Sequence, residues 1–133
     1  MDDSQPFIDE IIDFHRVIID LFAGTEPDPA AAVAALLTRF DPDFTMITPT
    51  GALLTLPDLR RLFEDGYGCR PDFAIEITDI VPVTIDARGA LVSYQERQQD
   101  RSGASTRRST AYFTLDSTGA VRWRHLQETW VAG

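Results

Sequence analysis

The second half of the chain, residues 73–131, has the pattern of four successive strands, and this run limits the chain to few folds. Three clusters of turn-forming residues interrupt it at regular spacing, at 86–89, 101–103 and 116–119. Before the first turn, apolar and polar side chains alternate with the period of two that is typical of a half-buried strand. The run therefore predicts an antiparallel meander with one apolar face, which other elements must cover.

The first half of the chain predicts helices that can cover this face. Its first segment places apolar residues three and four positions apart, with aspartates on the opposite side, as in an amphipathic helix. Asp28 followed by Pro29 favours the start of a second helix, and Thr55 with Asp58 resembles a capping box that opens a third. The predicted helices cover residues 6–23, about 29–40 and about 57–65, and two short strands cover 44–48 and 52–54.

Three N-terminal helices followed by strands indicate an α+β fold, in which the helices pack on the concave face of a strongly curved, mostly antiparallel sheet, a cone-shaped α+β barrel. No repeat or linker interrupts the chain, so we expect a single domain over residues 1–133. Cys69 is the only cysteine and cannot form an internal disulfide. No apolar run approaches the ~18 residues that span a bilayer, and the acidic first residues are unlike a signal peptide, so a cytoplasmic location is expected.

The charge balance excludes several classes of partner. Twelve basic and 21 acidic residues give a formal charge of −9, which repels phosphate backbones and anionic membrane surfaces. We therefore expect no nucleic acid and no membrane as partner. The two histidines lie 110 residues apart without the spacing of metal ligands, so neither a metal nor a cofactor is expected.

The order of these elements resembles the nuclear transport factor 2-like superfamily, and within it the small bacterial proteins that resemble SnoaL-type polyketide cyclases. Residues 44–51 and 123–130 carry most of the likeness. The resemblance implies a cavity between helices and sheet and a homodimer, but no particular reaction, because activities differ across the superfamily. Its ketosteroid isomerases have a general-base aspartate where Thr48 stands and a second acid near Ala111, so that chemistry is not expected here.

Which side chains enter the cavity depends on strand register, because opposed residues of an antiparallel pair share a face. Two-residue turns at 87–88 and 102–103 would pair Glu96 with Asp79 on one side and Ser109 on the other. The residues that we expect to line the cavity are His15, Tyr67, Tyr94, Glu96, Arg107, Ala111, Phe113, Trp123, Glu128 and Trp130.

The last strand, residues 121–131, has two possible registers that expose opposite faces to the cavity. A three-residue loop with Gly119 in a left-handed conformation turns Trp123 and every second residue after it inward. A two-residue loop instead selects Glu128 and Trp130, and a bulge within so long a strand would let both ends face in. We favour Glu128 and Trp130 inside near the mouth, with Trp123 buried at the narrow end.

In that arrangement Glu96, Arg107 and Glu128 meet on neighbouring strands, within reach of His15 and Tyr67. A buried carboxyl group without a partner has a raised pKa and suits proton transfer, whereas one that is paired with Arg107 stays ionised and structural. Glu96, Glu128 and His15 are therefore the candidate catalytic residues. The alternative is an ion-pair network that closes the open end of the sheet.

Three functions remain open from the sequence. The first is a binding domain that holds a small apolar or amphipathic ligand in an apolar cavity with a few polar groups. The second is an acid–base enzyme that acts on a cyclic or polyketide-like substrate. The third is an association module similar to the kinase association domains, with a homodimer formed through the outer sheet face around Ile80, Leu91 and Tyr112.

Overall fold

The predicted elements all occur, and in the predicted order, in a computed structural model that describes residues 3–132. The second helix ends three residues earlier than predicted, because Phe40 pairs with Trp123 as part of a strand. The elements are α1 (Gln5–Ala23), α2 (Pro29–Leu37), β1 (Phe40–Ile47), β2 (Leu53–Thr55), α3 (Leu56–Gly66), β3 (Ala74–Asp86), β4 (Gly89–Asp100), β5 (Gly103–Leu115) and β6 (Val121–Trp130).

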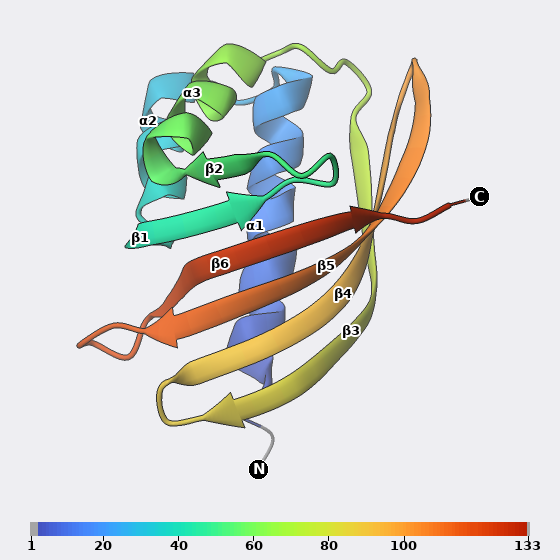
Figure 1. Cartoon of the computed structure of the whole chain (residues 1–133). Helices are drawn as coiled ribbons and strands as arrows, with labels where there is room; N and C mark the ends of the chain where they lie inside the picture. Colours follow the sequence, from blue (N-terminus) through green and yellow to red (C-terminus); the bar gives the residue numbers. More distant parts are fainter. Residues whose placement is uncertain (1–2, 133) are drawn as a thin grey trace.

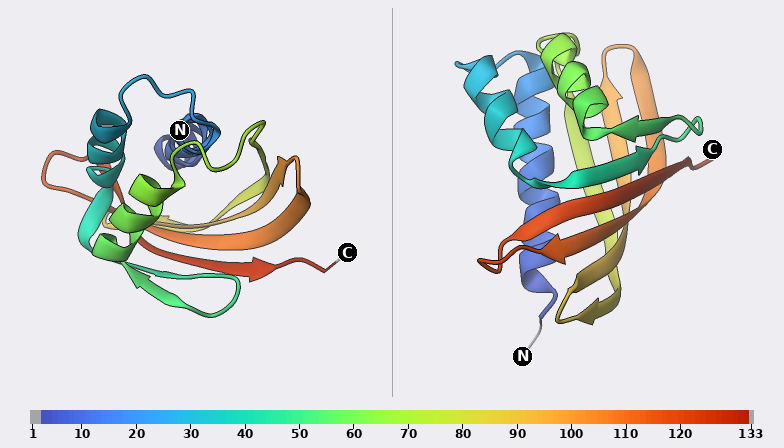
Figure 2. Two further views of the ribbon diagram at one scale, coloured as in Figure 1. Left: turned by 90° about the horizontal axis from the view of Figure 1, so that it is seen from above. Right: turned by 60° about the vertical axis from the view of Figure 1, so that its left-hand side comes forward.

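The six strands form one mixed sheet in the order β2-β1-β6-β5-β4-β3. Only β1 and β6 run parallel, and the other neighbouring strands are antiparallel. The sheet is strongly curled around the helices (Figure 1), and the view from above shows the helices lying within its concave side (Figure 2). The α+β prediction is thus confirmed, with a sheet that is curled but open.

The helix α1 provides most of the cover for the concave face. Its buried side includes Ile11, Phe14 and His15, and the Phe14 ring packs against Phe40 and Trp123, with ring centroids 5.6 and 5.1 Å away. Local signals set where helices begin: the Asp28 side chain accepts a hydrogen bond from the first turn of α2. No helix within residues 3–132 has the length and apolar character required to cross a membrane.

The register between β4 and β5 places Glu96 opposite Arg107, not opposite Ser109 as predicted. Asp100 causes the difference, because its carboxylate accepts hydrogen bonds from the backbone N–H and the hydroxyl of Ser102, at 2.8 and 2.6 Å. These bonds favour a turn at residues 101–102. The shift is two residues, so every side chain keeps its predicted face.

On the other side of β4, Glu96 pairs with Ile77 instead of the predicted Asp79. Two register shifts interrupt the β3–β4 ladder, one of them beside Asp79, whose φ angle is +54°. Bulges of this kind add residues to one strand and sharpen its bend. The pairing that a two-residue turn at 87–88 predicts therefore holds for residues 84–86 of β3 and is wrong for residues 74–82.

The last hairpin combines the two registers that the sequence leaves open. Its loop has Gly119 at a φ angle of +84°, and Phe113 pairs with Trp123, so Trp123 faces inward. The ladder then shifts: Arg124 is an extra residue on β6, and Tyr112 pairs with His125. This bulge turns the second half of β6 over, so that Glu128 also faces the concave side and is buried.

Candidate functional site

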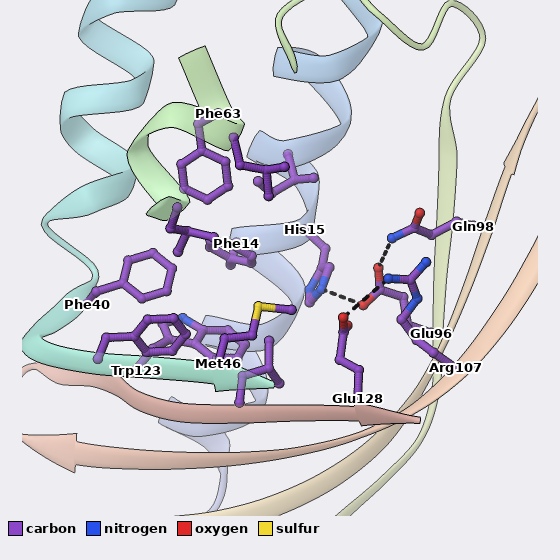
Figure 3. A pocket seen from close by; sticks show the side chains of 15 residues that line it. Phe14, His15, Phe40, Met46, Phe63, Glu96, Gln98, Arg107, Trp123 and Glu128 are labelled. Atoms are coloured by element: carbon purple, nitrogen blue, oxygen red, sulfur yellow. Dashed lines mark hydrogen bonds and ion pairs between the residues drawn. The ribbon is translucent and has the colours of Figure 1, made fainter. Parts of the chain in front are cut away.

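A cavity of about 120 Å³ lies between the helices and the concave face of the sheet. Figure 3 shows aromatic rings gathered at one end and polar side chains at the other. The exposed side chain of Leu62, on α3, contributes to its rim. The residues that line it are Phe14, His15, Ile18, Phe40, Phe44, Met46, Leu59, Leu62, Phe63, Glu96, Gln98, Arg107, Trp123, Leu126 and Glu128.

The aromatic end is tightly packed and leaves no polar group of Trp123 unpaired. The Trp123 side chain is fully buried, and its ring centroid lies 5.1 Å from that of Phe14 and 6.2 Å from that of Phe40. Its indole N–H donates to Glu10 at 2.9 Å, and Glu10 also accepts from Arg39 at 2.8 Å. A buried indole needs such a partner, so Glu10 stabilises this end of the cavity.

The polar end begins with a buried pair formed by His15 and Glu96. His15 Nε2 lies 3.0 Å from Glu96 Oε1, and His15 Nδ1 lies 2.6 Å from the carbonyl oxygen of Ile11. A carbonyl oxygen only accepts, so Nδ1 carries a hydrogen, and the proton between Nε2 and Glu96 decides the charge of both groups. The second Glu96 oxygen accepts from the Gln98 amide at 2.6 Å.

The electrostatics of this pair favour the charged form. Burial lowers the pKa of His15, but the charge and hydrogen bond of Glu96 outweigh it and raise that pKa above 6.5. Burial raises the pKa of Glu96, but the charge and hydrogen bond of His15 outweigh it and lower that pKa below 4.5. Each side chain therefore favours the charged form of the other, and the two form a buried ion pair below the raised pKa of His15.

Glu128, on the neighbouring part of the cavity wall, behaves in the opposite way. Burial and then the negative charge of Glu96 raise its pKa to about 7, although Arg107 acts in the opposite direction. Arg107 Nη1 donates to one Glu128 oxygen at 3.3 Å, which is long for a charge-assisted hydrogen bond. Within residues 3–132 the other Glu128 oxygen has no hydrogen-bond partner. Glu128 thus exchanges its proton near neutral pH.

Two hydroxyl groups behind the cavity wall also lack a hydrogen-bond partner among the described residues. These are Tyr94 Oη and Ser109 Oγ, on residues that pair across β4 and β5. Burial, followed by the charges of Glu96 and Glu128, raises the pKa of Tyr94 well above 10.0. Tyr94 therefore remains a neutral phenol and does not act as a base.

Half of the ten residues expected around the cavity line it. These are His15, Glu96, Arg107, Trp123 and Glu128. Three of the other expected residues from the sheet form a buried layer behind the wall instead: Tyr94, Ala111 and Phe113.

Two expected residues lie outside the cavity. Tyr67 follows the end of α3, and its hydroxyl donates to the carbonyl oxygens of Gly24 and Glu26, which holds the ring near the ends of the helices. Trp130 faces the same side as its partner Arg107, but its ring is 47% exposed and covers the Arg107 guanidinium at 4.8 Å from the ring centroid. Both placements correct the sequence prediction.

Other lining residues were missed by sequence reasoning although a signal existed. Gln98 follows Glu96 by two positions, and residues two apart on a strand share a face. The same rule applies to Phe44 and Met46 on β1. Phe40 carried no such signal, because the sequence placed it at the end of a helix.

Comparison with known proteins identifies the family. No protein-family model and no curated protein matches the chain. An NTF2-like protein of unknown function from Pseudomonas aeruginosa has a solved structure that superposes with a TM-score of 0.91. The two chains are 38% identical, and the match covers 96% of this chain and 99% of that chain. The chain therefore belongs to the NTF2-like superfamily.

Two more distant structures share the fold. An NTF2-like protein from Cytophaga hutchinsonii is 16% identical, with a TM-score of 0.72 over 98% of this chain and 100% of that chain. The CaMKII hub of S. rosetta is 13% identical, with a TM-score of 0.76 over 98% of each chain. Identities this low show only that these chains fold alike.

Proposed function

We propose that this domain binds a small amphipathic molecule in the cavity, with its apolar part among the aromatic rings and its polar part at Glu128. One observation carries the proposal: a cavity lined by aromatic side chains ends at a buried carboxyl group that has an unpaired oxygen. Ligand sites commonly combine an apolar lining with a few such polar groups. Glu96 and His15 bind each other, so they support the wall of the site.

The Glu128 carboxyl also favours a second candidate function, an acid–base enzyme. Its pKa of about 7 keeps both protonation states populated near neutral pH, which suits a general acid or base. In this function Glu128 would exchange a proton with the bound molecule. His15 and Glu96 would act as positioning residues, because their ion pair uses the oxygen and nitrogen atoms that would otherwise face a substrate.

A screen for thermal stabilisation tests binding in the cavity. Single-ring and two-ring acids, ketones, phenols and amines are the probes, and a ligand at 100 times its dissociation constant stabilises by about 2.7 kcal/mol. Two exposed leucines provide matched variants: Leu62 lines the cavity, whereas Leu53 on β2 does not. We expect stabilisation of the wild type and of Leu53→Trp but not of Leu62→Trp. A screen without any stabilising probe, or equal responses from the two variants, would refute the proposal.

We also propose that two copies associate through the outer face of the sheet. Tyr112 is 38% exposed there, and Leu91 pairs with it on the neighbouring strand. An aromatic and an aliphatic side chain among polar neighbours suit the centre of an interface. Sedimentation at micromolar concentration should show a dimer that Tyr112→Glu disrupts. A wild-type monomer at that concentration would exclude the proposed dimer.

A further inference from the structure

The size of the cavity limits what it can hold. Its volume is about 120 Å³, and an apolar cavity of roughly 150 Å³ in another protein is large enough to bind benzene. The rings around it already pack against one another, with Trp123 and Phe14 buried. A fused multi-ring ligand would have to displace these rings or protrude past Leu62 at the rim. The cavity therefore fits one ring.

The hydrogen bonds at the polar end define what the ring must carry. Both His15 nitrogens and both Glu96 oxygens have partners within the protein. Arg107 Nε lacks a partner among the described residues, but the atom is shielded from solvent and so from the cavity. Among the described residues two groups that can face the cavity are left without a partner: Nη2 of Arg107, which is a donor, and the second oxygen of Glu128, which is an acceptor. A hydroxyl group can accept from the first and donate to the second. A complementary ligand must supply a hydrogen-bond donor to the Glu128 oxygen.

The charges around Glu128 favour a neutral donor. The charged side chains that face it are His15 from α1, Glu96 from β4 and Arg107 from β5. An anionic ligand would meet two carboxyl groups, of which Glu96 is ionised. A cationic ligand would lose its hydration beside the guanidinium of Arg107 and the imidazolium of His15. A neutral hydroxyl avoids both costs, because it needs only one hydrogen bond to compensate its burial.

From these three observations we infer that the ligand of this site is a neutral single-ring molecule with a hydroxyl group, of the phenol class, and that Glu128 selects it by accepting its hydrogen bond. The inference rests on the proposed binding function and adds the class of ligand. The ring would occupy the space beside Phe14 and Trp123, where edge-to-face contacts between rings are favourable.

Isothermal titration with four probes of one ring each tests this inference: phenol, toluene, benzoate and benzylamine. At pH 8, where most of Glu128 is ionised, we expect wild type to bind phenol at least tenfold more tightly than toluene. In Glu128→Met, which keeps the length of the side chain without an acceptor, we expect the two affinities to differ by less than threefold. Thermal unfolding of each variant verifies that it is folded.

A pH series provides a second measurement that does not depend on a variant being folded. Protonation of Glu128 removes the ionised acceptor, so the advantage of phenol over toluene should decline as the pH falls from 8 to 5.5. Glu128→Met is the control for titration of His15, and its ratio of phenol to toluene affinity should not change with pH.

The outcomes separate the inference from the proposed function. Equal binding of toluene and phenol would leave a cavity that binds ligands and would overturn selection by Glu128. Tightest binding of benzoate or of benzylamine would also overturn the inference, because a charged group would then be preferred. Failure of all four probes to bind would contradict the inference, and the proposed function would fall only if the wider screen also found no ligand.

Discussion

The two halves of β6 face the same cavity but differ in how completely their polar groups are paired. In the first half, Trp123 is fully buried among rings and its N–H group bonds to Glu10. In the second half, Glu128 is buried beside Glu96, with one long hydrogen bond from Arg107 and a pKa of about 7. The first half contributes stability, whereas the second holds a group that costs stability when it ionises. Buried ionisable groups that are poorly paired and cost stability, such as Glu128, are expected at functional sites.

The bulge at Arg124 is what permits both halves to face inward. Deleting Arg124 removes the extra residue, so that the Phe113–Trp123 and Tyr112–His125 pairs become consecutive, while Leu126 and Glu128 still face inward. We expect the deletion variant to unfold cooperatively by circular dichroism, with a loss of about 1–3 kcal/mol, because the bend of β6 and the Arg124 hydrogen bond are lost while the buried faces are kept. Arg124→Ala is the control: it keeps the bulge, removes only the hydrogen bond to the Asp43 carbonyl, and should cost about 1 kcal/mol or less. Loss of cooperative unfolding in the deletion variant would show that the bend itself, and not only the inward faces of the two halves, is required.

The aromatic half should respond most strongly to truncation of its central ring. Trp123→Ala removes contacts with Phe14, Phe40 and Phe113 and leaves Glu10 without one of its donors. Denaturant unfolding should show a loss of about 3–5 kcal/mol. The matched variant is Trp130→Ala, which removes an exposed ring over Arg107 and should cost about 1 kcal/mol or less. Similar losses in the two variants would contradict the distinction between a core ring and a surface ring.

In the polar half, a substitution that removes the charge of Glu128 should increase stability instead of decreasing it. The pKa of Glu128 rises from 4.5 in the unfolded chain to about 7 in the folded one, so the folded state binds the proton more tightly. The free energy of unfolding therefore falls as pH rises from about 4.5 to 7, by about 3 kcal/mol from this group.

Glu128→Gln removes this penalty, so the variant should be more stable than wild type at pH 8 by about 3 kcal/mol, with the gain disappearing towards pH 4.5. Urea unfolding at several pH values measures the difference. The exposed Glu76 on β3 offers the control, Glu76→Gln, which should change stability by about 0.5 kcal/mol or less at every pH. A gain that does not vary with pH would argue against ionisation of Glu128 as its cause.

A smaller effect concerns the ion pair that holds Glu96. Glu96→Gln should cost about 2 kcal/mol near pH 6 and move the pKa of His15 from above 6.5 to below it, because burial then acts with less opposition. The His15 resonances followed by NMR through a pH titration measure this change. If the pKa of His15 is the same in Glu96→Gln as in wild type, the two side chains do not form the proposed ion pair.

The sign of the pH dependence of this pair follows from both shifts. Because the pKa of His15 is raised in the folded state, its contribution is complete below pH 6.5 and is lost as pH rises through the folded value. Because the pKa of Glu96 is lowered, its contribution is complete above pH 4.5 and is lost as pH falls through the folded value. The pair stabilises the fold most between these two values, an interval in which the Glu128 contribution also changes with pH.

Features that depend on a few neighbouring residues could be predicted from the sequence. Asp28 caps α2, and the Thr55 N–H donates to Asp58 at 2.9 Å at the start of α3, as the capping patterns indicate. The meeting of Glu96, Arg107 and Glu128 with His15 also followed from alternation, because an error of two residues in register preserves the face.

Features that depend on contacts between distant segments could not be predicted. The positions of Tyr67 and Trp130 depend on the carbonyl groups of residues 24 and 26 and on the guanidinium of Arg107, none of which is a neighbour in sequence. The register of β4 against β5 depends on which turn Asp100 stabilises, and several turns satisfied the same pattern of residues.

By itself, the sequence determined the order of helices and strands, the curled α+β architecture and the set of charged residues on the inner face. These follow from capping residues and from the periods of helix and strand, which are local properties. Only the tertiary structure decided that β6 bulges at Arg124, so that one strand carries both the buried Trp123 and the inward-facing Glu128. The physical reason is that burying both side chains against α1 favours a register that local loop geometry alone does not specify.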